Sequence, residues 1–474
     1  MTKIESQLVF LPSPGIGHLI STIEFAKLII NRDHRLSITI LVMKTPLQTV
    51  TPSFTDSIFS TKRLHVINLP QPQITNSDLN APGSFITTLI HTYKPYVRDH
   101  VTQLVNSPHS PRLGGFVVDM FCTPMIDVAR EFHVPAFVFF TSSAASLGLV
   151  LHLYTLRERD GFNATLLKNT DTELVIPSFV NPVSAKVLPS FVLNKEWEPA
   201  FLILGEGLKK ADGIIVNSFE ELESHAVHFL NLADNNNIPI YPVGPILKIN
   251  DDNDVVIVKW LDDQPHSSVI FLCFGSMGSV HEDQVREIAR ALEDSGARFI
   301  WSLRKSPPKG LTNMAQPTEY APQELIDVLP YGFLDRTAET GRVIGWAPQA
   351  QILAHQATAG FVSHCGWNST LESIYFGVPI ATWPLHAEQQ INAFQLVREL
   401  NMAVEITLDY RVEFKVGSNT LLGADKIERG IRDLMENDEV KKRVKDMSDE
   451  SRKTLTLGGC SYSHLGRFID SIIN

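Results

Sequence analysis

Residues 346–389 read WAPQAQILAHQATAGFVSHCGWNSTLESIYFGVPIATWPLHAEQ, in which short apolar runs are followed directly by polar residues. Gly360–Val362 predicts a buried strand that ends in Ser-His-Cys-Gly, and a helix is expected to follow it. Free backbone N–H groups and a hydroxyl at a helix start can bind a phosphate without a lysine. His364, Asn368 and Ser369 are therefore candidate phosphate ligands. Taken alone, Asn368 and Ser369 are better explained as helix caps.

Four further side chains of this stretch can complete a site for a nucleotide and a sugar. Trp346 follows an expected strand and can offer a flat face to a base, although an isolated tryptophan is more often part of a core. Glu372 lies one helical turn after Asn368 and can take vicinal ribose hydroxyls, although alone it fits a solvated glutamate. Glu388 and Gln389 stand at another strand-to-helix junction, where a carboxylate accepts and an amide both donates and accepts hydrogen bonds to hydroxyls.

Strand and helix patterns alternate along the whole chain. The apolar runs lack a period of two, which predicts parallel sheets covered by helices on both faces. The expected strands are residues 7–11, 37–43, 64–69, 116–118, 136–140 and 213–216 in the first half, and 269–274, 299–303, 342–344, 360–362, 379–383 and 403–406 in the second. Three prolines and a glycine interrupt the pattern at Ile238–Pro245, which we interpret as a linker. Because 474 residues exceed a single core, two α/β domains are expected.

Composition narrows the class of protein and of partner. Hydrophobic residues make up 44% and charged residues 20%, the balance of a soluble globular protein. A net charge of −11 argues against nucleic acid or an anionic membrane as the main partner and favours a small molecule. The four cysteines form no Cys-x-x-Cys pair, which is typical of a reducing compartment. With neither a signal peptide nor an apolar span expected, we predict a cytoplasmic protein without a membrane span.

The first half contains a candidate general base. His18 follows Pro14-Gly15-Ile16-Gly17 at the end of the first expected strand and opens the next helix. A helix N-terminus disfavours imidazolium and so favours the neutral form that a base requires, although a lone histidine at such a turn is more often structural. Asp119 follows another expected strand, and carboxyl ends of parallel strands meet at the ligand-binding edge of a sheet.

The same glycine turn leaves a second enzyme class open. Gly15-x-Gly17 weakly suggests a nucleotide-dependent oxidoreductase, but Ile20 stands where a third glycine is expected. The second strand ends in Met43-Lys44-Thr45, without the acidic residue that would hold a ribose. A non-catalytic sensor that binds a nucleotide and a sugar is a third alternative, and it predicts that His18 and Asp119 are dispensable.

Over its whole length, the 346–389 stretch resembles the signature box of the plant secondary-product UDP-glycosyltransferases, family 1, of the GT-B fold. The opening turn that ends at His18, the Phe274–Ser276 motif and the chain length are also similar to this family. The resemblance implies two Rossmann-like, doubly wound domains that face each other across a cleft. It places the acceptor-binding domain at 1–245, the UDP-sugar-binding domain at 246–458, and a C-terminal helix at 459–474 that packs back on the first domain.

The resemblance also implies a role for each candidate residue. The donor residues so implied are Trp346 for stacking on uracil, Ala347 and Gln349 for base and ribose, Glu372 for the ribose hydroxyls, Ser276, His364, Asn368 and Ser369 for the diphosphate, and Trp367, Glu388 and Gln389 for the sugar. His18 is the implied catalytic base with Asp119 as its partner, and Thr141 is implied to reach the sugar. Glu388 departs from the aspartate of many members and has a longer reach. Gln389 implies glucose, where members that use galactose often carry histidine.

The implied reaction is displacement at the anomeric carbon with inversion, which moves glucose from UDP-glucose to a hydroxyl of a small lipophilic acceptor. A flavonoid, another phenolic or a triterpenoid would receive it as a β-glucoside. UDP-glucose is a co-substrate, and neither a cofactor nor a metal is expected, since no Asp-x-Asp element stands near the diphosphate residues. UDP-galactose and UDP-xylose remain alternative donors. We expect a monomer that binds no nucleic acid.

Overall fold

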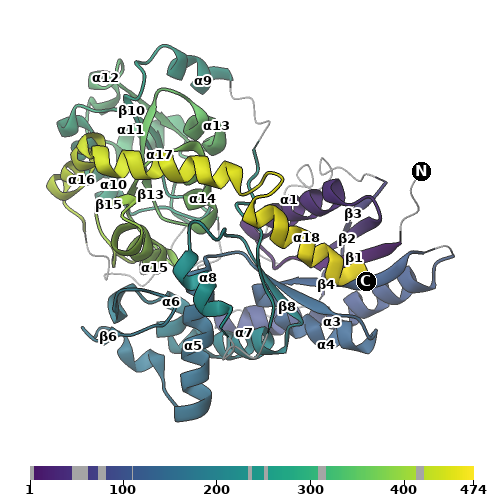
Figure 1. The fold of residues 1–474 in the computed structure, drawn as a ribbon. Coiled ribbons are helices and arrows are strands. Elements are labelled where there is room, and N and C mark those ends of the chain that lie inside the picture. Colours follow the sequence, from purple (N-terminus) through teal and green to yellow (C-terminus); the bar gives the residue numbers. More distant parts are fainter. Residues whose placement is uncertain are drawn as a thin grey trace. The chain divides into compact units, whose positions relative to one another are not determined.

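The computed structural model describes residues 5–44, 62–72, 82–108, 110–232, 238–249, 255–307, 316–412 and 421–473 (Figure 1). Contacts divide the chain into two compact units. Unit 1 comprises Met1–Ala185, Phe191–Lys248 and Lys453–Asn474, and unit 2 comprises Lys186–Ser190 and Ile249–Arg452. The boundaries at Lys248 and Arg452 lie within a few residues of the expected domain ends at 245 and 458. The assignment of Lys186–Ser190 to unit 2 has no counterpart in the sequence pattern.

Unit 1 is built on a parallel seven-stranded sheet in the order β3-β2-β1-β4-β5-β8-β9. Its strands are β1 (Ser6–Leu11), β2 (Leu36–Val42), β3 (Leu64–Asn68), β4 (Arg112–Asp119), β5 (Ala136–Phe140), β8 (Gly213–Val216) and β9 (Ile240–Pro242). The last strand corrects the interpretation of 238–245 as a linker, because Ile240 and Pro242 pair with Ile214 and Val216 of β8. Proline is tolerated there because β9 lies at the edge of the sheet.

Most helices of unit 1 lie between its strands along the chain, whereas the last one follows unit 2 (Figure 1). They are α1 (Ile16–Arg32), α3 (Pro82–Asn106), α4 (Ile126–Glu131), α5 (Ala144–Asp160), α7 (Glu198–Lys210), α8 (Ser224–Leu230) and α18 (Cys460–Ile473), with the short α6 (Ser190–Leu193) at the boundary between the units. A two-stranded antiparallel ribbon joins β6 (Glu173–Leu174) to β7 (Val183–Ser184). No helix in the described ranges is both long and apolar enough to cross a bilayer.

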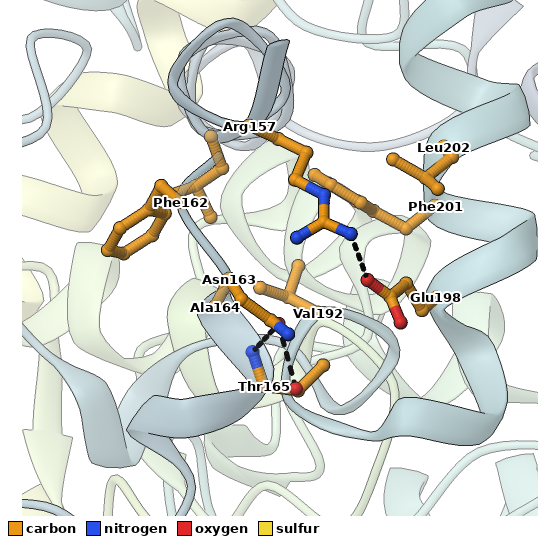
Figure 2. Close-up of a pocket in the computed structure, with 10 residues that line it drawn as sticks. Arg157, Phe162, Asn163, Ala164, Thr165, Val192, Glu198, Phe201 and Leu202 are labelled. Atoms are coloured by element: carbon orange, nitrogen blue, oxygen red, sulfur yellow. Dashed lines mark hydrogen bonds and ion pairs between the residues drawn. The ribbon is translucent and has the colours of Figure 1, made fainter. Parts of the chain in front are cut away.

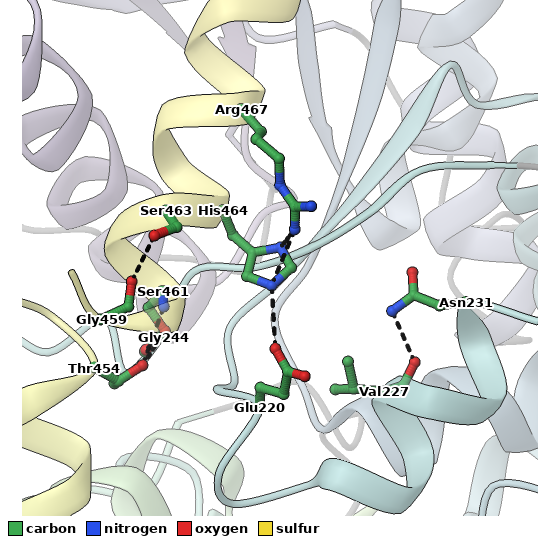
Figure 3. Close-up of polar contacts among 10 residues, drawn as sticks. All are labelled: Glu220, Val227, Asn231, Gly244, Thr454, Gly459, Ser461, Ser463, His464 and Arg467. Carbon is green, nitrogen blue, oxygen red and sulfur yellow. Dashed lines mark hydrogen bonds and ion pairs between the residues drawn. The ribbon is translucent and has the colours of Figure 1, made fainter.

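The C-terminal helix α18 completes the core of unit 1. Phe468 lies in one buried cluster with residues of β1, α1 and β5, and its ring centroid is 5.0 Å from that of Phe137 and 5.9 Å from that of Phe25. Polar contacts fix the start of the helix, where Ser461 Oγ donates to the carbonyl oxygen of Gly244 at 2.6 Å (Figure 3). The last helix is therefore an integral part of the first unit and contributes buried apolar area to it.

Unit 2 repeats the architecture with a parallel six-stranded sheet in the order β12-β11-β10-β13-β14-β15. The strands are β10 (Val269–Cys273), β11 (Arg298–Ser302), β12 (Gly341–Ile344), β13 (Thr358–Ser363), β14 (Ile380–Thr382) and β15 (Ala403–Glu405). The helices are α9 (Val255–Asp262), α10 (Glu282–Ser295), α11 (Pro322–Val328), α12 (Phe333–Arg336), α13 (Gln349–Ala354), α14 (Trp367–Phe376), α15 (Gln389–Phe394), α16 (Ala424–Glu436) and α17 (Asp438–Lys453). The two parallel sheets confirm the predicted doubly wound α/β class.

Each sheet has a point at which the strand order reverses, between β1 and β4 in unit 1 and between β10 and β13 in unit 2. Open α/β sheets bind ligands outside the carboxyl ends of the strands at such a switch point. His18 follows β1, and Asp119 is the last residue of β4. Ser276 follows β10, and His364 follows β13. The topology thus brings the candidates of each unit to its own switch point.

Candidate functional site

The switch point of unit 1 contains a histidine–carboxylate pair. His18 lies in the first turn of α1, after Gly15, whose φ of +154° is a conformation that side chains rarely adopt. Asp119 Oδ2 lies 2.7 Å from His18 Nδ1, while the side chain of Asp119 is fully buried and that of His18 is 30% exposed. Asp119 Oδ1 accepts a hydrogen bond from the backbone N–H of Phe121 at 3.1 Å. The carboxylate is therefore held at both oxygens.

This geometry fixes which nitrogen of the imidazole can act as a base. With Nδ1–H donating to the buried carboxylate, Nε2 carries the lone pair and can take a proton from a substrate hydroxyl. The carboxylate then stabilises the imidazolium that forms. The ring of Phe121 packs against the imidazole with centroids 5.7 Å apart and restricts its rotation. The arrangement can perform general-base chemistry.

Thr141 also joins this site. Its Oγ1 lies 3.1 Å from His18 Nδ1, so the structure places the hydroxyl beside the dyad. The loop that carries Thr141 leads into α5, whose N-terminus is capped by Ser143 and by the buried carboxylate of Glu223. Glu223 accepts hydrogen bonds from the backbone N–H groups of Ala144 at 2.7 Å and Ala145 at 2.9 Å. We did not predict Glu223 from the sequence, since nothing local marks a glutamate that acts on a helix start far away in the chain.

At the switch point of unit 2, the imidazole of His364 lies between two glycines. A Cβ atom added at Gly275 or at Gly366 would lie 2.5 Å from His364 Nε2. Burial, with the nearby His386 as a second cause, lowers the pKa of His364 to about 3, so this imidazole is neutral at physiological pH. It can donate or accept a hydrogen bond but does not bring a charge to the site.

Helix α14 begins beside His364 and presents its N-terminus to the switch point. Its N-cap is Gly366, which has no side chain, so the interpretation of Asn368 and Ser369 as caps is wrong. Asn368 lies in the first turn, with the backbone N–H groups that this turn leaves without helical partners. Trp367 is only 2% exposed and packs in the core of unit 2. An anion at this helix start is favoured by the helix dipole.

Gln349 joins two other predicted residues into one polar cluster. Its Nε2 donates to Ser369 Oγ at 2.9 Å and to Glu372 Oε2 at 2.6 Å. Gln349 is the first residue of α13, and Ala347 precedes it in a tight turn in which the Gln349 N–H donates to the Ala347 carbonyl oxygen at 2.9 Å. Ser276 is half-buried in the turn after β10. The structure thus brings residues from separate elements into a cluster that can serve hydroxyls and phosphate oxygens.

Trp346 lies on the surface, so its alternative role in a core is wrong. It is 54% exposed, and the Arg304 guanidinium carbon lies 5.3 Å from the centroid of the indole. Its backbone N–H donates to Glu319 Oε1 at 3.0 Å. We did not predict Arg304 or Glu319, because Glu319 lies in an irregular segment whose partners only the folded chain reveals. The bond to Glu319 fixes the backbone of Trp346, and the indole ring keeps a large exposed area for stacking.

The turn 385–389, which we call the sugar turn, holds Gln389 in one orientation. Gln389 Oε1 accepts hydrogen bonds from the backbone N–H groups of Leu385 at 2.8 Å and His386 at 3.0 Å. The expectation that this amide both donates and accepts toward a sugar therefore needs correction, because its oxygen is already used and only Nε2 can face a ligand. Glu388 is the N-cap of α15, and the preceding Ala387 has a φ of +57°. Strained backbone of this kind is concentrated at functional sites.

One pocket of unit 1 lies apart from these residues. It is lined mainly by apolar side chains together with the ion pair between Arg157 and Glu198, whose Nη2 and Oε1 atoms are 2.9 Å apart (Figure 2). Leu153 lines it, but none of the residues predicted for catalysis or donor binding does. In the ranges that the structure describes, no cluster of three or more His, Cys, Asp or Glu side chains has a geometry that could hold a metal ion.

Two Rossmann-like sheets, each with candidate site residues at its own switch point, fit the GT-B class of transferases. The sequence model of the family described as UDP-glucoronosyl and UDP-glucosyl transferase matches residues 248–412. UDP-glycosyltransferase 71A15 of Malus domestica is 52% identical over 99% of this chain and 100% of its own length. UDP-glucose flavonoid 3-O-glucosyltransferase 6 of Fragaria ananassa is 50% identical over 99% of both chains.

Similar solved structures belong to the same class of transferase as the sequence relatives. A Siraitia grosvenorii transferase in complex with UDP is 46% identical, with a TM-score of 0.88 over 99% of this chain and 100% of that one. A Medicago truncatula glycosyltransferase complexed with UDP-glucose is 38% identical, with a TM-score of 0.86 over 99% of both chains. The chain belongs to the UDP-glycosyltransferase family and is a UDP-sugar-dependent transferase. The oxidoreductase alternative is wrong.

Proposed function

We propose that the protein moves glucose from UDP-glucose to a hydroxyl of a small lipophilic acceptor and releases a β-glucoside. The observation that carries this proposal is the 2.7 Å contact between His18 Nδ1 and the buried Asp119 carboxylate. A binding module would have no use for such a base, and burying a carboxylate has a free-energy cost unless a partner compensates it. The sensor alternative does not explain why the chain buries the Asp119 carboxylate beside His18.

The proposed step is a direct displacement. His18 Nε2 takes the proton of the acceptor hydroxyl, and the acceptor oxygen forms a bond to the anomeric carbon. The bond from that carbon to the UDP oxygen breaks on the opposite face, and UDP leaves with the electron pair. An α-linked donor therefore gives a β-linked product. Asp119 stabilises the imidazolium during the step, and general-base catalysis of this kind contributes about 10²–10⁴-fold.

The donor roles follow the geometry of unit 2. We assign stacking on uracil to Trp346, and the ribose hydroxyls to Glu372 with Gln349. The start of α14 takes the diphosphate, together with the neutral imidazole of His364. Asn368, Ser369 and Ser276 complete the diphosphate site, and Glu388 and Gln389 take the sugar. Because the proposed anion site of unit 2 consists of N–H groups and an uncharged ring, we propose that neither a metal nor a cofactor takes part.

Related proteins suggest the acceptor class. The Fragaria ananassa relative carries flavonoid in its name, and a 31% identical Phytolacca americana transferase was solved with pterostilbene. We propose a flavonoid, another phenolic or a triterpenoid as the acceptor. The described cysteines are all free, which fits the proposed cytoplasmic location, where we expect the protein to act as a monomer.

A panel of acceptors tests this proposal. The purified protein is incubated with UDP-glucose, UDP-galactose or UDP-xylose and each acceptor, and products are detected by mass spectrometry with and without excess EDTA. We expect one added hexose with UDP-glucose, at an unchanged rate in EDTA. Loss of transfer in EDTA that Mg²⁺ or Mn²⁺ restores would overturn the metal-free mechanism. Absence of product with every acceptor, together with intact UDP binding, would favour the sensor.

A further inference from the structure

A short strap of chain, Lys186–Ser190, contacts the sugar turn from outside. The strap belongs to unit 2, although the residues on both sides of it belong to unit 1. The backbone N–H of Ser190 donates to the carbonyl oxygen of Ala387 at 3.0 Å. Ala387 directly precedes Glu388, so this bond acts on the peptide that joins Ala387 to the proposed sugar ligand.

Arg411 holds the strap at three points. Its Nη1 donates to Ser190 Oγ at 2.7 Å, and its Nη2 donates to the carbonyl oxygens of Lys186 at 2.8 Å and Leu188 at 2.6 Å. A guanidinium can make these bonds together because its donors lie in one plane at fixed angles, which an ammonium group cannot reproduce. Bonds from a charged donor are about twice as strong as those between neutral groups.

The segment that carries Arg411 also touches the sugar turn directly. The backbone N–H of Val412 donates to the carbonyl oxygen of Leu385 at 2.9 Å. Directly after the turn, Gln390 Nε2 donates to the carbonyl oxygen of Tyr410 at 2.8 Å. The sugar turn is thus fixed from the 410–412 segment and from the strap. Arg411 joins these two supports to each other.

The strained backbone explains why the turn requires such support. Ala387 has a φ of +57°, a conformation that is unfavourable for an alanine and persists only when its surroundings determine it. Its carbonyl oxygen is held by the strap, and the N–H groups on its N-terminal side are held by Gln389 Oε1. Release of the strap would let the Ala387–Glu388 peptide rotate toward an unstrained conformation and turn Glu388 away.

We propose that Arg411 is a positioning residue for the donor sugar, which it serves by clamping the strap against the sugar turn. This inference rests on the proposed role of Glu388 and Gln389 as sugar ligands. Arg411 acts on the hexose end of the donor, whereas the base, ribose and diphosphate are assigned to other elements. Loss of the clamp should therefore weaken binding of UDP-glucose and leave binding of UDP unchanged.

Calorimetric titration of UDP and of UDP-glucose, without acceptor, tests the proposal. For Arg411→Met we expect the Kd of UDP-glucose to rise about 10-fold, equivalent to about 1.4 kcal/mol, while the Kd of UDP stays within about twofold. Arg411→Lys should not restore the wild-type value. Ser190→Pro removes the N–H that holds Ala387 and also the hydroxyl that accepts from Arg411, at the first position of α6 where proline fits, and should show the same selective loss.

Two reference variants separate the possible failures. Arg298→Met removes an arginine of unit 2 whose Nη1 donates to Gln264 Oε1 at 2.7 Å, and it should change neither Kd. Glu388→Ala reports the loss of a sugar contact itself. Equal weakening of both ligands by Arg411→Met and Ser190→Pro, or weakening of neither, overturns the clamp. If Glu388→Ala also leaves UDP-glucose binding unchanged, the proposed sugar site fails as well.

Discussion

His18 and His364 occupy comparable places in the two units and have opposite chemistry. Each lies after a strand that borders the switch point of a doubly wound sheet. His18 is partly exposed and lies against the buried carboxylate of Asp119. His364 is buried between two glycines, no carboxylate of the described residues pairs with it, and burial lowers its pKa to about 3. The same fold position therefore holds the proposed proton acceptor in unit 1 and, in unit 2, a ring that is neutral at physiological pH.

Removal of the unit 1 imidazole should have the largest effect. In His18→Ala we expect kcat to fall by about 10²–10⁴-fold, because the acceptor hydroxyl loses its base. The Kd of UDP should stay at the wild-type value, since the proposed nucleotide residues all belong to unit 2. Steady-state kinetics and calorimetry measure the two quantities. More than half of wild-type turnover in the purified variant would show that His18 is not the base.

Displacement of the unit 2 imidazole should weaken nucleotide binding instead. Gly366 has an ordinary φ of −62°, so Gly366→Ala strains no backbone, but the new Cβ would lie 2.5 Å from His364 Nε2. We expect the Kd of UDP to rise by about 10-fold or more, which corresponds to the loss of a hydrogen bond of about 1.5 kcal/mol. The matched control is Gly423→Ala, at an N-cap with a φ of −68° and no atom within 4 Å of the added Cβ. Equal effects of the two variants would contradict a role for the position of His364.

Donor choice should respond to Gln389. A site whose polar groups match one epimer leaves them unpaired with the other, at about 1–3 kcal/mol per group. We expect UDP-glucose to exceed UDP-galactose by about 10-fold or more in kcat/KM, and Gln389→His to narrow the gap. Histidine cannot reproduce the acceptance of two backbone N–H bonds by Gln389 Oε1, so the variant should also lose thermal stability. Equal efficiencies of the two donors in the wild type would remove Gln389 as the selector.

The smallest effect should be a loss of stability in mild acid. Burial lowers the pKa of His364 to about 3 and that of His386 to about 4. Below the unfolded pKa of about 6.5 the unfolded chain binds protons that these buried rings do not, so the free energy of unfolding falls as pH falls. Each ring should contribute about 1.4 kcal/mol per pH unit. Thermal melts at pH 7.5 and 5.5 should show a smaller difference in Tm between the two pH values for His364→Gln than for the wild type. The control His34→Gln, which replaces an exposed histidine, should keep the full difference in Tm.

Much of the fold follows from local sequence. Apolar runs such as those of β1 and β13 are buried on both faces of parallel sheets, so their composition alone marks them as strands. The exception is β9, where Pro242 and the preceding Pro239 are typical of a connection, and only its pairing with β8 makes it a strand. An edge position tolerates prolines because the missing N–H groups need no partner in the sheet.

The candidate site was predictable to the extent that residues lie at strand ends. His18 and Asp119 are 101 positions apart, yet each lies at the carboxyl end of a strand next to the switch point, so their meeting follows from topology. The sequence did not show that Glu319 supports Trp346 or that the Gln389 oxygen is engaged by its own turn. Those contacts depend on the course of irregular loops, for which short-range patterns carry no signal.

The sequence by itself determined the two-sheet architecture, the family and the side chains available at each strand end, because these depend on burial patterns and on one long specific stretch. Only the tertiary structure decided which histidine can act as a base, because that depends on a buried carboxylate from another strand. It also decided that Arg411 holds the strap, since two of the three acceptors of its guanidinium are backbone carbonyls, which any residue type can supply. Charge state and orientation arise from neighbours in space, which local sequence does not specify.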